Sequence, residues 1–360
     1  MNTGLQITDL EVQDETCRIH GQKRRTLPLL NFMQFSFIWC GFPDAKNYII
    51  ILNLIIMYLI SESEVRENLN YSELIDALEQ AFVRISVGKA ILQPRIRSSI
   101  GGITLNTLPS IIPDLGVAGI KAYLNNGKAT TFQYMLFRIS DPSPVASIEA
   151  NYLGQIRTGA LSALASRLLY RKRNPRLLVA GSGFQAESQL KAHLSAFEPE
   201  QTLVYSRNPE HAESFSRKME SSTGQSVRVE KDIATAVNDS DLICSATSAR
   251  EPFLRGKYFR DEFHLNLVGS NILSRREADT SVFLKAESVI VESKEQAMLE
   301  SAEIIELMKA DPGSQLVELK DLVTARDEFS GKKRTIFKSM GNGIEDLVAS
   351  YLVCRNMGLL

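Results

Sequence analysis

Apolar runs and amphipathic segments alternate most regularly between residues 177 and 207. The apolar run 177–180 leads into the glycine-containing segment 181–186, and a helical pattern follows over residues 187–196. A second apolar run, 203–205, ends at Ser206-Arg207. The order strand, glycine turn, helix, strand predicts the first βαβ unit of a dinucleotide-binding sheet.

The small residues of the glycine turn have separate expected roles. Gly181 permits a tight turn, Gly183 lets backbone N–H groups approach a pyrophosphate, and Ala186 lets the helix pack closely on the strand. The pyrophosphate would lie at the helix N-terminus, where unpaired N–H groups and the helix dipole favour an anion. Phe184 and Gln185, between Gly183 and Ala186, complete the predicted cofactor-binding turn.

The alternation continues beyond this unit. Helices are predicted over residues 209–221, 233–237 and 295–310, and strands over residues 226–229, 241–245, 265–268 and 288–291. Repeated βα units predict a doubly wound parallel sheet. Residues 341–346 begin a last helix, with Glu345 and Asp346 in its first turn, where acidic side chains favour the helix dipole.

The chain between residues 57 and 170 has a different pattern. Residues 61–64 have the form of a helix start, and apolar residues at helical spacing continue the predicted helix to residue 85. Short strands are predicted around residues 104–108, 116–123 and 134–139. A turn is predicted at residues 141–144, and the small-residue-rich helix 157–170 leads into the nucleotide-binding sheet. Strands that follow a helix in this way predict a separate α+β domain.

Residues 1–56 share neither pattern. A basic cluster at residues 22–25 precedes an almost continuously apolar run at residues 48–60, which is too short for a membrane helix. No small-residue cleavage site follows, so a signal peptide is not indicated. We interpret residues 1–56 as an added or poorly ordered extension before a strand at residues 57–60. A membrane-associating tail is the alternative.

Composition narrows the class of protein. Hydrophobic residues make up 44% and charged residues 23% of the chain, as in ordinary globular proteins. The net charge is −1 and there is no basic stripe, so nucleic acid is not an expected partner. The four cysteines and four histidines are scattered, which argues against a metal site and a disulfide framework. We expect reduced thiols in the cytoplasm and no membrane.

The end of the second predicted strand bears on the choice of cofactor. An NAD site normally places Asp or Glu here to accept a hydrogen bond from the ribose 2′-OH, whereas Arg suits a 2′-phosphate. This chain has Ser206-Arg207-Asn208 and no acidic residue before Glu210. The pattern favours NADP(H) over NAD(H), and NAD(H) stays open as the alternative.

Seven segments in order together resemble the ornithine cyclodeaminase and mu-crystallin family. They cover residues 57–360. Their motifs are Gln93-Pro94-Arg95, Gly119-Ile120-Lys121, residues 156–160 (IRTGA), residues 181–186, residues 264–271 (HLNLVGSN), residues 289–296 (VIVESKEQ), and residues 336–341 (IFKSMG) before Ile344-Glu345-Asp346. The resemblance implies a Rossmann-type sheet inserted into a smaller α+β substrate-binding and dimerisation domain. We expect residues 57–168 and 335–360 to form the latter, residues 169–334 to form the NAD(P) domain, and the protein to be a homodimer.

The resemblance also implies the substrate site. In that family, an arginine after proline, a lysine at a strand end and an arginine before threonine hold an amino-acid substrate, and Arg95, Lys121 and Arg157 match them. Guanidinium groups grip carboxylates, and a lysine near other cations can trade a proton. Arg157 and Thr158 are alternatively cofactor ligands, and Arg97 is a second candidate for Arg95. The implied site further includes Met340 and Gly341 on the substrate side and Ala246, Thr247 and Gly269 near the nicotinamide.

Asn271 departs from the family pattern. Cyclodeaminases and alanine dehydrogenases of the family carry aspartate at this place, and a carboxylate can take the proton of an α-ammonium before oxidation. An amide cannot, although it can orient an imine or a water by hydrogen bonds. Asn271 therefore favours imine reduction. Glu277 or Asp279 could substitute, but both are expected on a solvated helix turn.

Three functions stay open. The favoured one is an NADP(H)-dependent reductase or dehydrogenase of a small α-imino or α-amino acid, similar to ketimine reductases, pyrroline-carboxylate reductases or alanine dehydrogenases. The second is an ornithine cyclodeaminase, an ammonia-lyase that forms proline with bound NAD+. The third is a non-enzymatic, NADPH-linked binding protein for small ligands. Retention of Lys121 and both arginines argues against a purely structural role.

Overall fold

The structure is a computed structural model that describes residues 31–35, 52–329 and 331–360. Strands β1 (Asn31–Phe35) and β2 (Leu52–Ile56) pair with each other in antiparallel fashion. The remainder of the predicted extension over residues 1–56 lies outside the described residues. The strand expected at residues 57–60 is β3 (Tyr58–Ile60).

The first large sheet has six strands in the order β3-β8-β7-β6-β5-β4. Its strands after β3 are β4 (Ile96–Ile100), β5 (Ile103–Ile112), β6 (Val117–Asn125), β7 (Thr130–Arg138) and β8 (Ser143–Glu149), with the 3-10 helix η1 (Pro113–Leu115) between β5 and β6. All neighbouring pairs are antiparallel except β3 with β8. Sequence analysis missed β4 and β8, because β4 is exposed throughout and β8 contains Pro144.

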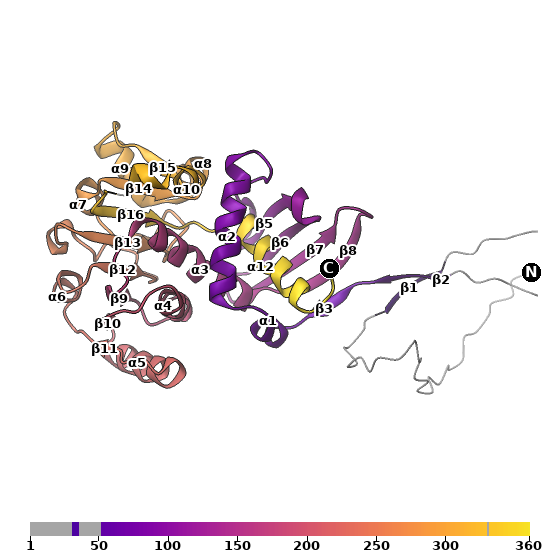
Figure 1. Cartoon of the computed structure of the whole chain (residues 1–360), viewed down its shortest axis with the longest axis horizontal. Helices are drawn as coiled ribbons and strands as arrows, with labels where there is room; N and C mark the ends of the chain where they lie inside the picture. Colours follow the sequence, from indigo (N-terminus) through magenta and orange to yellow (C-terminus); the bar gives the residue numbers. More distant parts are fainter. Residues whose placement is uncertain (1–30, 36–51, 330) are drawn as a thin grey trace, which may run out of the picture.

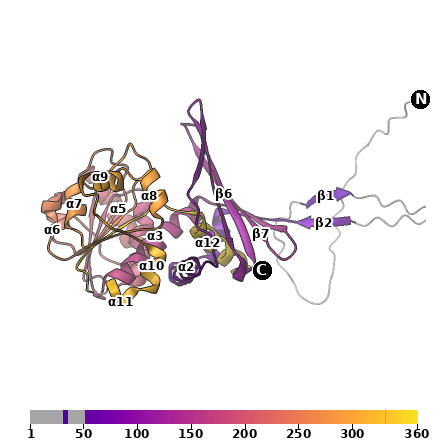
Figure 2. The same ribbon diagram turned by 90° about the horizontal axis from the view of Figure 1, so that it is seen from above.

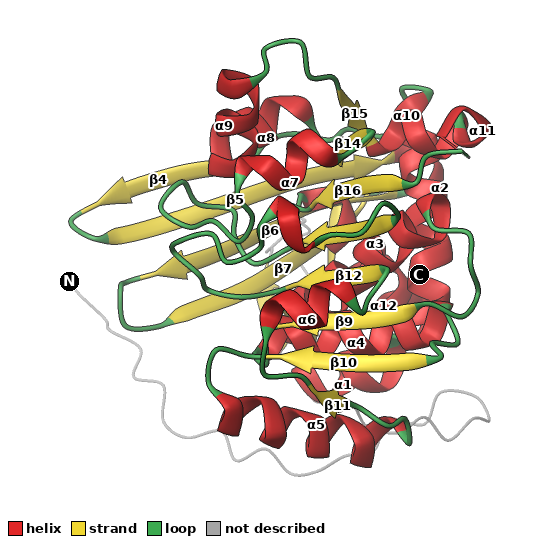
Figure 3. Cartoon of the chain, turned by 90° about the vertical axis from the view of Figure 1, so that its left-hand side faces the viewer, coloured by secondary structure: helices red, strands yellow, loops and turns green. Residues whose placement is uncertain are grey.

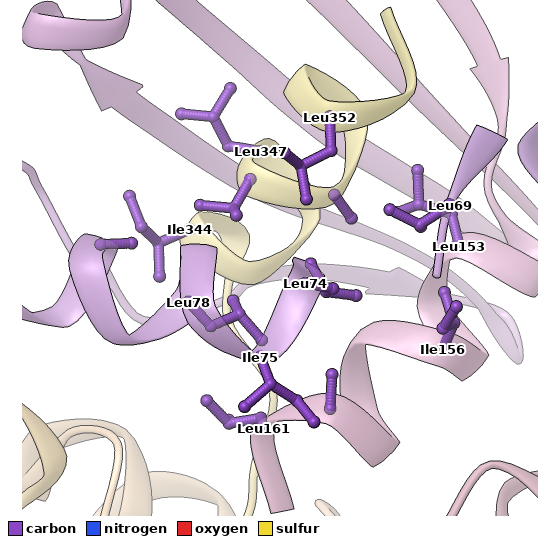
Figure 4. Close-up of a cluster of buried hydrophobic side chains, with 14 of the residues drawn as sticks. Leu69, Leu74, Ile75, Leu78, Leu153, Ile156, Leu161, Ile344, Leu347 and Leu352 are labelled. Atoms are coloured by element: carbon purple, nitrogen blue, oxygen red, sulfur yellow. The ribbon is translucent and has the colours of Figure 1, made fainter. Parts of the chain in front are cut away.

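Helices cover one face of this sheet. They are α1 (Glu62–Asn68), α2 (Tyr71–Ser86), α3 (Asn151–Leu169) and α12 (Gly343–Asn356). Figure 4 shows their shared core, in which Leu74 and Leu78 of α2 lie near Leu347 of α12 and Leu161 of α3. The C-terminal helix thus returns to the N-terminal domain.

The second sheet has eight parallel strands in the order β11-β10-β9-β12-β13-β16-β14-β15 (Figure 3). The strands are β9 (Arg176–Ala180), β10 (Gln201–Tyr205), β11 (Arg228–Val229), β12 (Leu242–Ser245), β13 (Phe263–Leu267), β14 (Ser288–Val291), β15 (Leu316–Glu318) and β16 (Arg334–Lys338). The predicted Rossmann-type α/β fold is confirmed, because the strand order reverses between β9 and β12 and helices connect the strands.

The domain boundary predicted at residue 335 differs from the structure. Strand β16 lies between β13 and β14, so residues 334–338 belong to the nucleotide-domain sheet. Only the segment that contains α12 crosses to the other domain. The sequence did not predict this strand, because a lysine usually marks an exposed position and the five-residue strand ends in Lys338. Lys338 is nevertheless fully buried.

The remaining helices of the nucleotide domain are mostly short. They are α4 (Phe184–Ala196), α5 (Pro209–Thr223), α6 (Ile233–Asn238), η2 (Gly256–Tyr258), α7 (Thr280–Lys285), α8 (Lys294–Glu300), α9 (Ala302–Ala310), α10 (Leu319–Thr324) and α11 (Arg326–Phe329). The single helix predicted over residues 295–310 is two helices. Ser301 is extended and its side chain caps α9 by accepting a hydrogen bond from Ile304 N.

Helix α3 lies where the two domains meet, against α2 and α12 on one side and α4, β13 and β16 on the other (Figure 1). Figure 2 shows the same junction from above. Nearly all of its residues from 153 to 169 are buried. Its many small residues let α4 approach closely, and its length places Arg157 and Thr158 at the junction of the domains.

Candidate active site

The turn after β9 forms one end of a nucleotide-sized cavity of about 1150 Å³. Gly181 has φ +130°, and a Cβ there would lie 2.5 Å from the carbonyl oxygen of Ala246. Gly183 is the N-cap of α4 and provides no side-chain hydrogen bond to the first turn. The N–H groups of this turn are therefore available to an anion such as a pyrophosphate.

Most of the predicted cofactor residues line this cavity. They are Gly181, Gly183, Phe184, Gln185, Ser206, Arg207, Asn208, Ala246, Thr247 and Gly269. Ala186 instead lies on the buried face of α4, in the core. Arg157 and Thr158 line the neighbouring cavity rather than this one.

The end of β10 presents a free cation to the nucleotide cavity. Ser206 accepts a hydrogen bond from Ser182 (3.0 Å between the two Oγ atoms), and Asn208 caps α5. Arg207 is exposed and makes no hydrogen bond or ion pair with any residue that the structure describes. It can therefore contact a phosphate without first leaving a carboxylate partner.

A second cavity, of about 500 Å³, adjoins the first. Both are lined by Phe184, Gln185, Val268, Gly269 and Arg275. The second cavity brings Arg95, Lys121 and Arg157 together from three different elements. Asp and Glu are absent from its lining, so the cavity suits an anionic ligand.

Lys121 extends from β6 toward the start of α12. Its Nζ donates to Asp346 Oδ1 (2.8 Å), and the side chain is almost completely buried. Burial lowers the pKa of the Lys121 ammonium, and Arg157 and Arg95 lower it further, whereas Asp346 raises it. Asp346 is the only hydrogen-bond partner of Nζ among the described residues, so the other N–H bonds can serve a ligand.

Arg157 is held by the same helix start. Its Nη1 donates to Glu345 Oε2 (2.6 Å) and its Nε to Asp346 Oδ1 (3.3 Å). Burial opposes the charge, but Asp346 and Glu345 hold the pKa of Arg157 above its ordinary value. Gly341 has φ +73°, a backbone conformation that favours glycine, and a Cβ there would lie 2.6 Å from Arg157 Nη1. Both the backbone and the space beside Arg157 therefore favour glycine at this position.

Arg95 is fixed by a different set of acceptors. Its Nη1 donates to Glu300 Oε2 (2.7 Å), and its Nη2 donates to the carbonyl oxygens of Met340 (3.1 Å) and Gly341 (3.0 Å). Its Nε is buried without a partner in the described chain, and can donate to a ligand carboxylate. Arg97, the alternative candidate, does not line the cavity; it binds Glu300 and the carbonyl oxygen of Asn271.

Asn271 lies on the wall of the second cavity, in the turn that follows β13. Its Nδ2 donates weakly to Met340 O (3.4 Å). Lys338 supports the same turn, since its Nζ donates to the carbonyl oxygen of Ser270 (2.7 Å). Asn271 is therefore placed beside the junction of the two cavities, with its carboxamide available to a substrate nitrogen or a water.

The expectation that Glu277 is solvated was wrong. Its side chain is fully buried, and its carboxylate accepts hydrogen bonds from Ser245 Oγ, Thr247 N and Oγ1, and Gly269 N, all at 2.7–2.8 Å. Burial raises the pKa of Glu277, while Lys338 and these hydrogen bonds lower it. Glu277 thus ties the ends of β12 and β13 together, and Asp279 is the N-cap position of α7.

Sequence reasoning also missed the carboxylates that hold the three cations. Glu345 and Asp346 were interpreted only as helix-dipole acids, and Glu300 was not singled out. Glu292 binds the backbone N–H groups of Met340 and Gly341 and so shapes the same wall. The motif Gly341-Asn342-Gly343 before two acids was the available signal, since it places them at the N-terminus of a helix.

The residues that the structure describes contain no group of three or more His, Cys, Asp or Glu residues arranged to hold a metal ion. They also contain no helix whose length and hydropathy would suit a bilayer crossing.

Comparison with known proteins agrees with this architecture. The sequence model of the ornithine cyclodeaminase/mu-crystallin family matches residues 57–358. The chain is 31% identical over 322 residues to a Delta(1)-pyrroline-2-carboxylate reductase of Colwellia psychrerythraea, covering 84% of this chain and 99% of that one. It is 30% identical over 308 residues to the ketimine reductase mu-crystallin of Rattus norvegicus, covering 82% and 95%.

A solved structure has the same fold. The Delta(1)-pyrroline-2-carboxylate reductase of Thermococcus litoralis, in complex with NADH and L-proline, superimposes with a TM-score of 0.75 at 27% identity, covering 83% of this chain and 97% of that one. The family match, the two relatives and the shared architecture lead to one conclusion: the chain belongs to the ornithine cyclodeaminase/mu-crystallin family.

Proposed function

We propose that this protein is an NADP(H)-dependent oxidoreductase that reduces a small α-imino acid, cyclic or linear, and oxidises the matching α-amino acid in reverse. One observation carries the proposal. Three buried cations, each with an N–H not used by the protein, converge on a cavity that shares a wall with the nucleotide cavity. The relatives named above are reductases of pyrroline-2-carboxylate and ketimines, which are α-imino acids of this kind.

The residues of the substrate cavity have complementary roles in this reaction. The substrate carboxylate accepts hydrogen bonds from Arg95 and Arg157, and Lys121 contributes a third donor. Lys121 is also the proton donor when an unprotonated imine binds. The Asn271 carboxamide orients the imine nitrogen or a water beside it. Met340 and Gly341 complete the wall beside Asn271 through their backbone.

The nucleotide cavity fits a dinucleotide. The glycine turn leaves room above Gly183, where a Cβ would meet nothing within 4 Å, and the N-terminus of α4 is open to a pyrophosphate. The cofactor, when bound, supplies the hydride and takes it back in the reverse direction. Arg207 favours NADP(H), since it can pair with a 2′-phosphate. NAD(H) is the alternative, and NADH is the cofactor of the T. litoralis complex.

Ornithine cyclodeamination is the second candidate. A bound ornithine carries a side-chain ammonium, which would need an acidic partner when it is desolvated. The cavity lining contains four cationic residues and no Asp or Glu, and residue 271 is not aspartate. Both observations favour imine reduction. The unused donors of Lys121 and Arg157 would serve a binding protein without catalysis equally well, so measured turnover separates that third candidate from an enzyme.

We infer that the protein acts as a homodimer in the cytoplasm. The outward face of the six-stranded sheet exposes apolar side chains from three adjacent strands: Ile96, Ile100, Ile103, Leu105, Ile111 and Leu124. A second copy of the chain would cover this apolar face. Cys244 and Cys354 are free and buried, which suits a reducing compartment.

A nicotinamide absorbance screen tests the proposed function. The full chain is assayed with small cyclic and linear imino acids plus NADPH or NADH, and with the matching amino acids plus NADP+ or NAD+. We expect turnover of imino acids with preference for NADPH. Absence of turnover with every substrate, together with tight NADPH binding, would instead support the binding-protein alternative.

A further inference from the structure

Lys121 is surrounded by charge from several elements. It faces Asp346 from α12, Arg157 from α3 and Arg95 from the segment before β4, and its Nζ lies 5.4 Å from the centre of the Phe132 ring on β7. Tyr134 pairs with it in register on β7, and burial raises the pKa of that phenol. Two of the three charged neighbours are cations.

The buried position of Lys121 and its two cationic neighbours disfavour the charged form of its side chain. Burial and neighbouring positive charges both stabilise the neutral amine over the ammonium. A neutral Lys121 could neither attract a carboxylate nor donate a proton to an imine. Asp346 is the one carboxylate in direct contact with Nζ, and it also contacts Nε of Arg157.

We propose that Asp346 is a positioning residue that keeps Lys121 charged and directs its remaining N–H bonds into the substrate cavity. This inference rests on the proposed function, in which Lys121 binds and protonates the substrate. Asp346 itself does not line the cavity. It acts on the substrate through the side chains that it contacts, mainly Lys121 (2.8 Å) and more weakly Arg157 (3.3 Å).

The geometry of α12 supports this role. Asn342 and Glu345 form a capping box that fixes the first helical turn, where Asp346 is fully buried. One oxygen of Asp346 accepts from both Lys121 and Arg157, and the other, Oδ2, has no hydrogen-bond partner in the described chain. The carboxylate therefore has no neutral donor that would replace Lys121 as its partner.

Glu345 provides a matched control for Asp346. It is the adjacent residue in the same turn and is equally buried, yet its hydrogen-bond partners are Arg157 and the backbone of Asn342 rather than Lys121. D346N and E345Q each replace a buried carboxylate with an amide of similar shape. Only D346N removes the countercharge of Lys121.

The test is the pH dependence of kcat/KM for imine reduction and of the affinity for pyrrole-2-carboxylate with NADPH bound. This probe has a carboxylate but no basic nitrogen, so its charge stays constant above neutral pH. We expect the basic limb of both profiles to move at least about 1 pH unit lower in D346N, as is usual when an opposite charge in contact is removed. In E345Q the limb should stay at the wild-type pH, and D346E should restore it.

D346S must give the same shift, and it replaces D346N if that variant does not fold. An unchanged basic limb in D346N or D346S, or an equal shift in E345Q, would overturn the inference. A different variant tests the proposed function itself. If K121A retains wild-type turnover, the proposed role of Lys121 is wrong, whatever the Asp346 variants show.

Discussion

At the scale of single residues, the candidate site consists of cations whose bonds to the protein are incomplete. Arg95, Lys121 and Arg157 each bind a buried carboxylate, and each keeps at least one N–H for a ligand. The sequence could identify these three residues because they stand in recognisable motifs. It could not identify Asp346 as a partner of Lys121, since 225 positions separate them and only the fold brings them together.

Loss of Lys121 should abolish most turnover. K121A should reduce kcat by at least about 10²-fold, the usual scale for a positioned acid–base group, while NADPH still binds. Stopped-flow turnover and a fluorescence titration with NADPH measure the two effects. Because K121A also leaves a cavity where the buried lysine side chain lay, K121M, which keeps most of the side-chain volume, serves as a second variant. Wild-type turnover in both variants would exclude Lys121 from the chemistry.

Arg207 should determine the preference for NADPH. R207A should weaken NADPH binding by about 1–3 kcal/mol, because a charge-assisted hydrogen bond to the 2′-phosphate is lost, and should leave NADH binding nearly unchanged. Arg250 is a matched control, since it lines the same cavity but follows β12. Calorimetric titrations give the affinities. Equal losses for both cofactors would show that Arg207 does not recognise the 2′-phosphate.

Asn271 should set the direction of the reaction. N271D supplies a carboxylate that can take the α-ammonium proton, so the oxidation rate should rise relative to the reduction rate, most clearly near neutral pH. The ratio of the two rates at several pH values measures this effect. A ratio that is the same in wild type and N271D would remove residue 271 from the proton transfer.

At the scale of elements, a buried polar seam joins α3, α4 and β13. His193 Nδ1 donates to the carbonyl oxygen of Gln189 (2.7 Å), so Nε2 is left to accept from Ser166 Oγ (2.9 Å). Asn266 of β13 donates to the same hydroxyl (2.9 Å). Sequence patterns identified these elements by their apolar positions, but the polar residues that fix their contacts have no period and were not predicted.

The seam should make stability depend on pH. Burial lowers the pKa of His193 to about 4, below the unfolded value of about 6.5. The contribution of neutral His193 to the free energy of unfolding is complete above about pH 6.5. It is lost as the pH falls toward 4, because the histidine is protonated in the unfolded chain before it is protonated in the folded one. Urea titrations between pH 7.5 and 4.5 give the free energy of unfolding at each pH. In H193N this free energy should fall less steeply with pH than in wild type, by up to about 1.4 kcal/mol per pH unit.

The exposed His211 offers a control for this measurement. H211N should keep the wild-type slope, because the His211 side chain is in contact with solvent in the folded chain. If H193N also keeps the wild-type slope, His193 is not the group that couples folding to protons.

At the scale of the whole molecule, two sheets meet at α3, and both cavities lie at their junction. Repeated βα units were sufficient to predict the parallel sheet, and the C-terminal helix was expected to return to the other domain. The position of β16 was not predictable, because a five-residue strand with a buried lysine has no distinguishing pattern. The buried Glu277 was missed for the same reason, since tertiary contacts alone decide its burial.

The apolar outer face of the six-stranded sheet should hold a dimer together. Leu105 and Leu124 pair across β5 and β6 on that face. L105R should shift the mass measured by light scattering from dimer to monomer, because a charge would be buried without a partner. K128E, in the exposed turn between β6 and β7, should not change the mass. A monomeric wild type would refute the inferred dimer.

The most direct test of the proposed chemistry compares two reactions of the wild-type protein at neutral pH. One is the oxidation of NADPH with Δ1-pyrroline-2-carboxylate, and the other is the release of ammonia and proline from ornithine with NAD+. The account predicts rapid NADPH oxidation, coupled to formation of proline, and little reaction with ornithine. Brisk formation of proline from ornithine, with slow imine reduction, would contradict it and establish cyclodeamination instead.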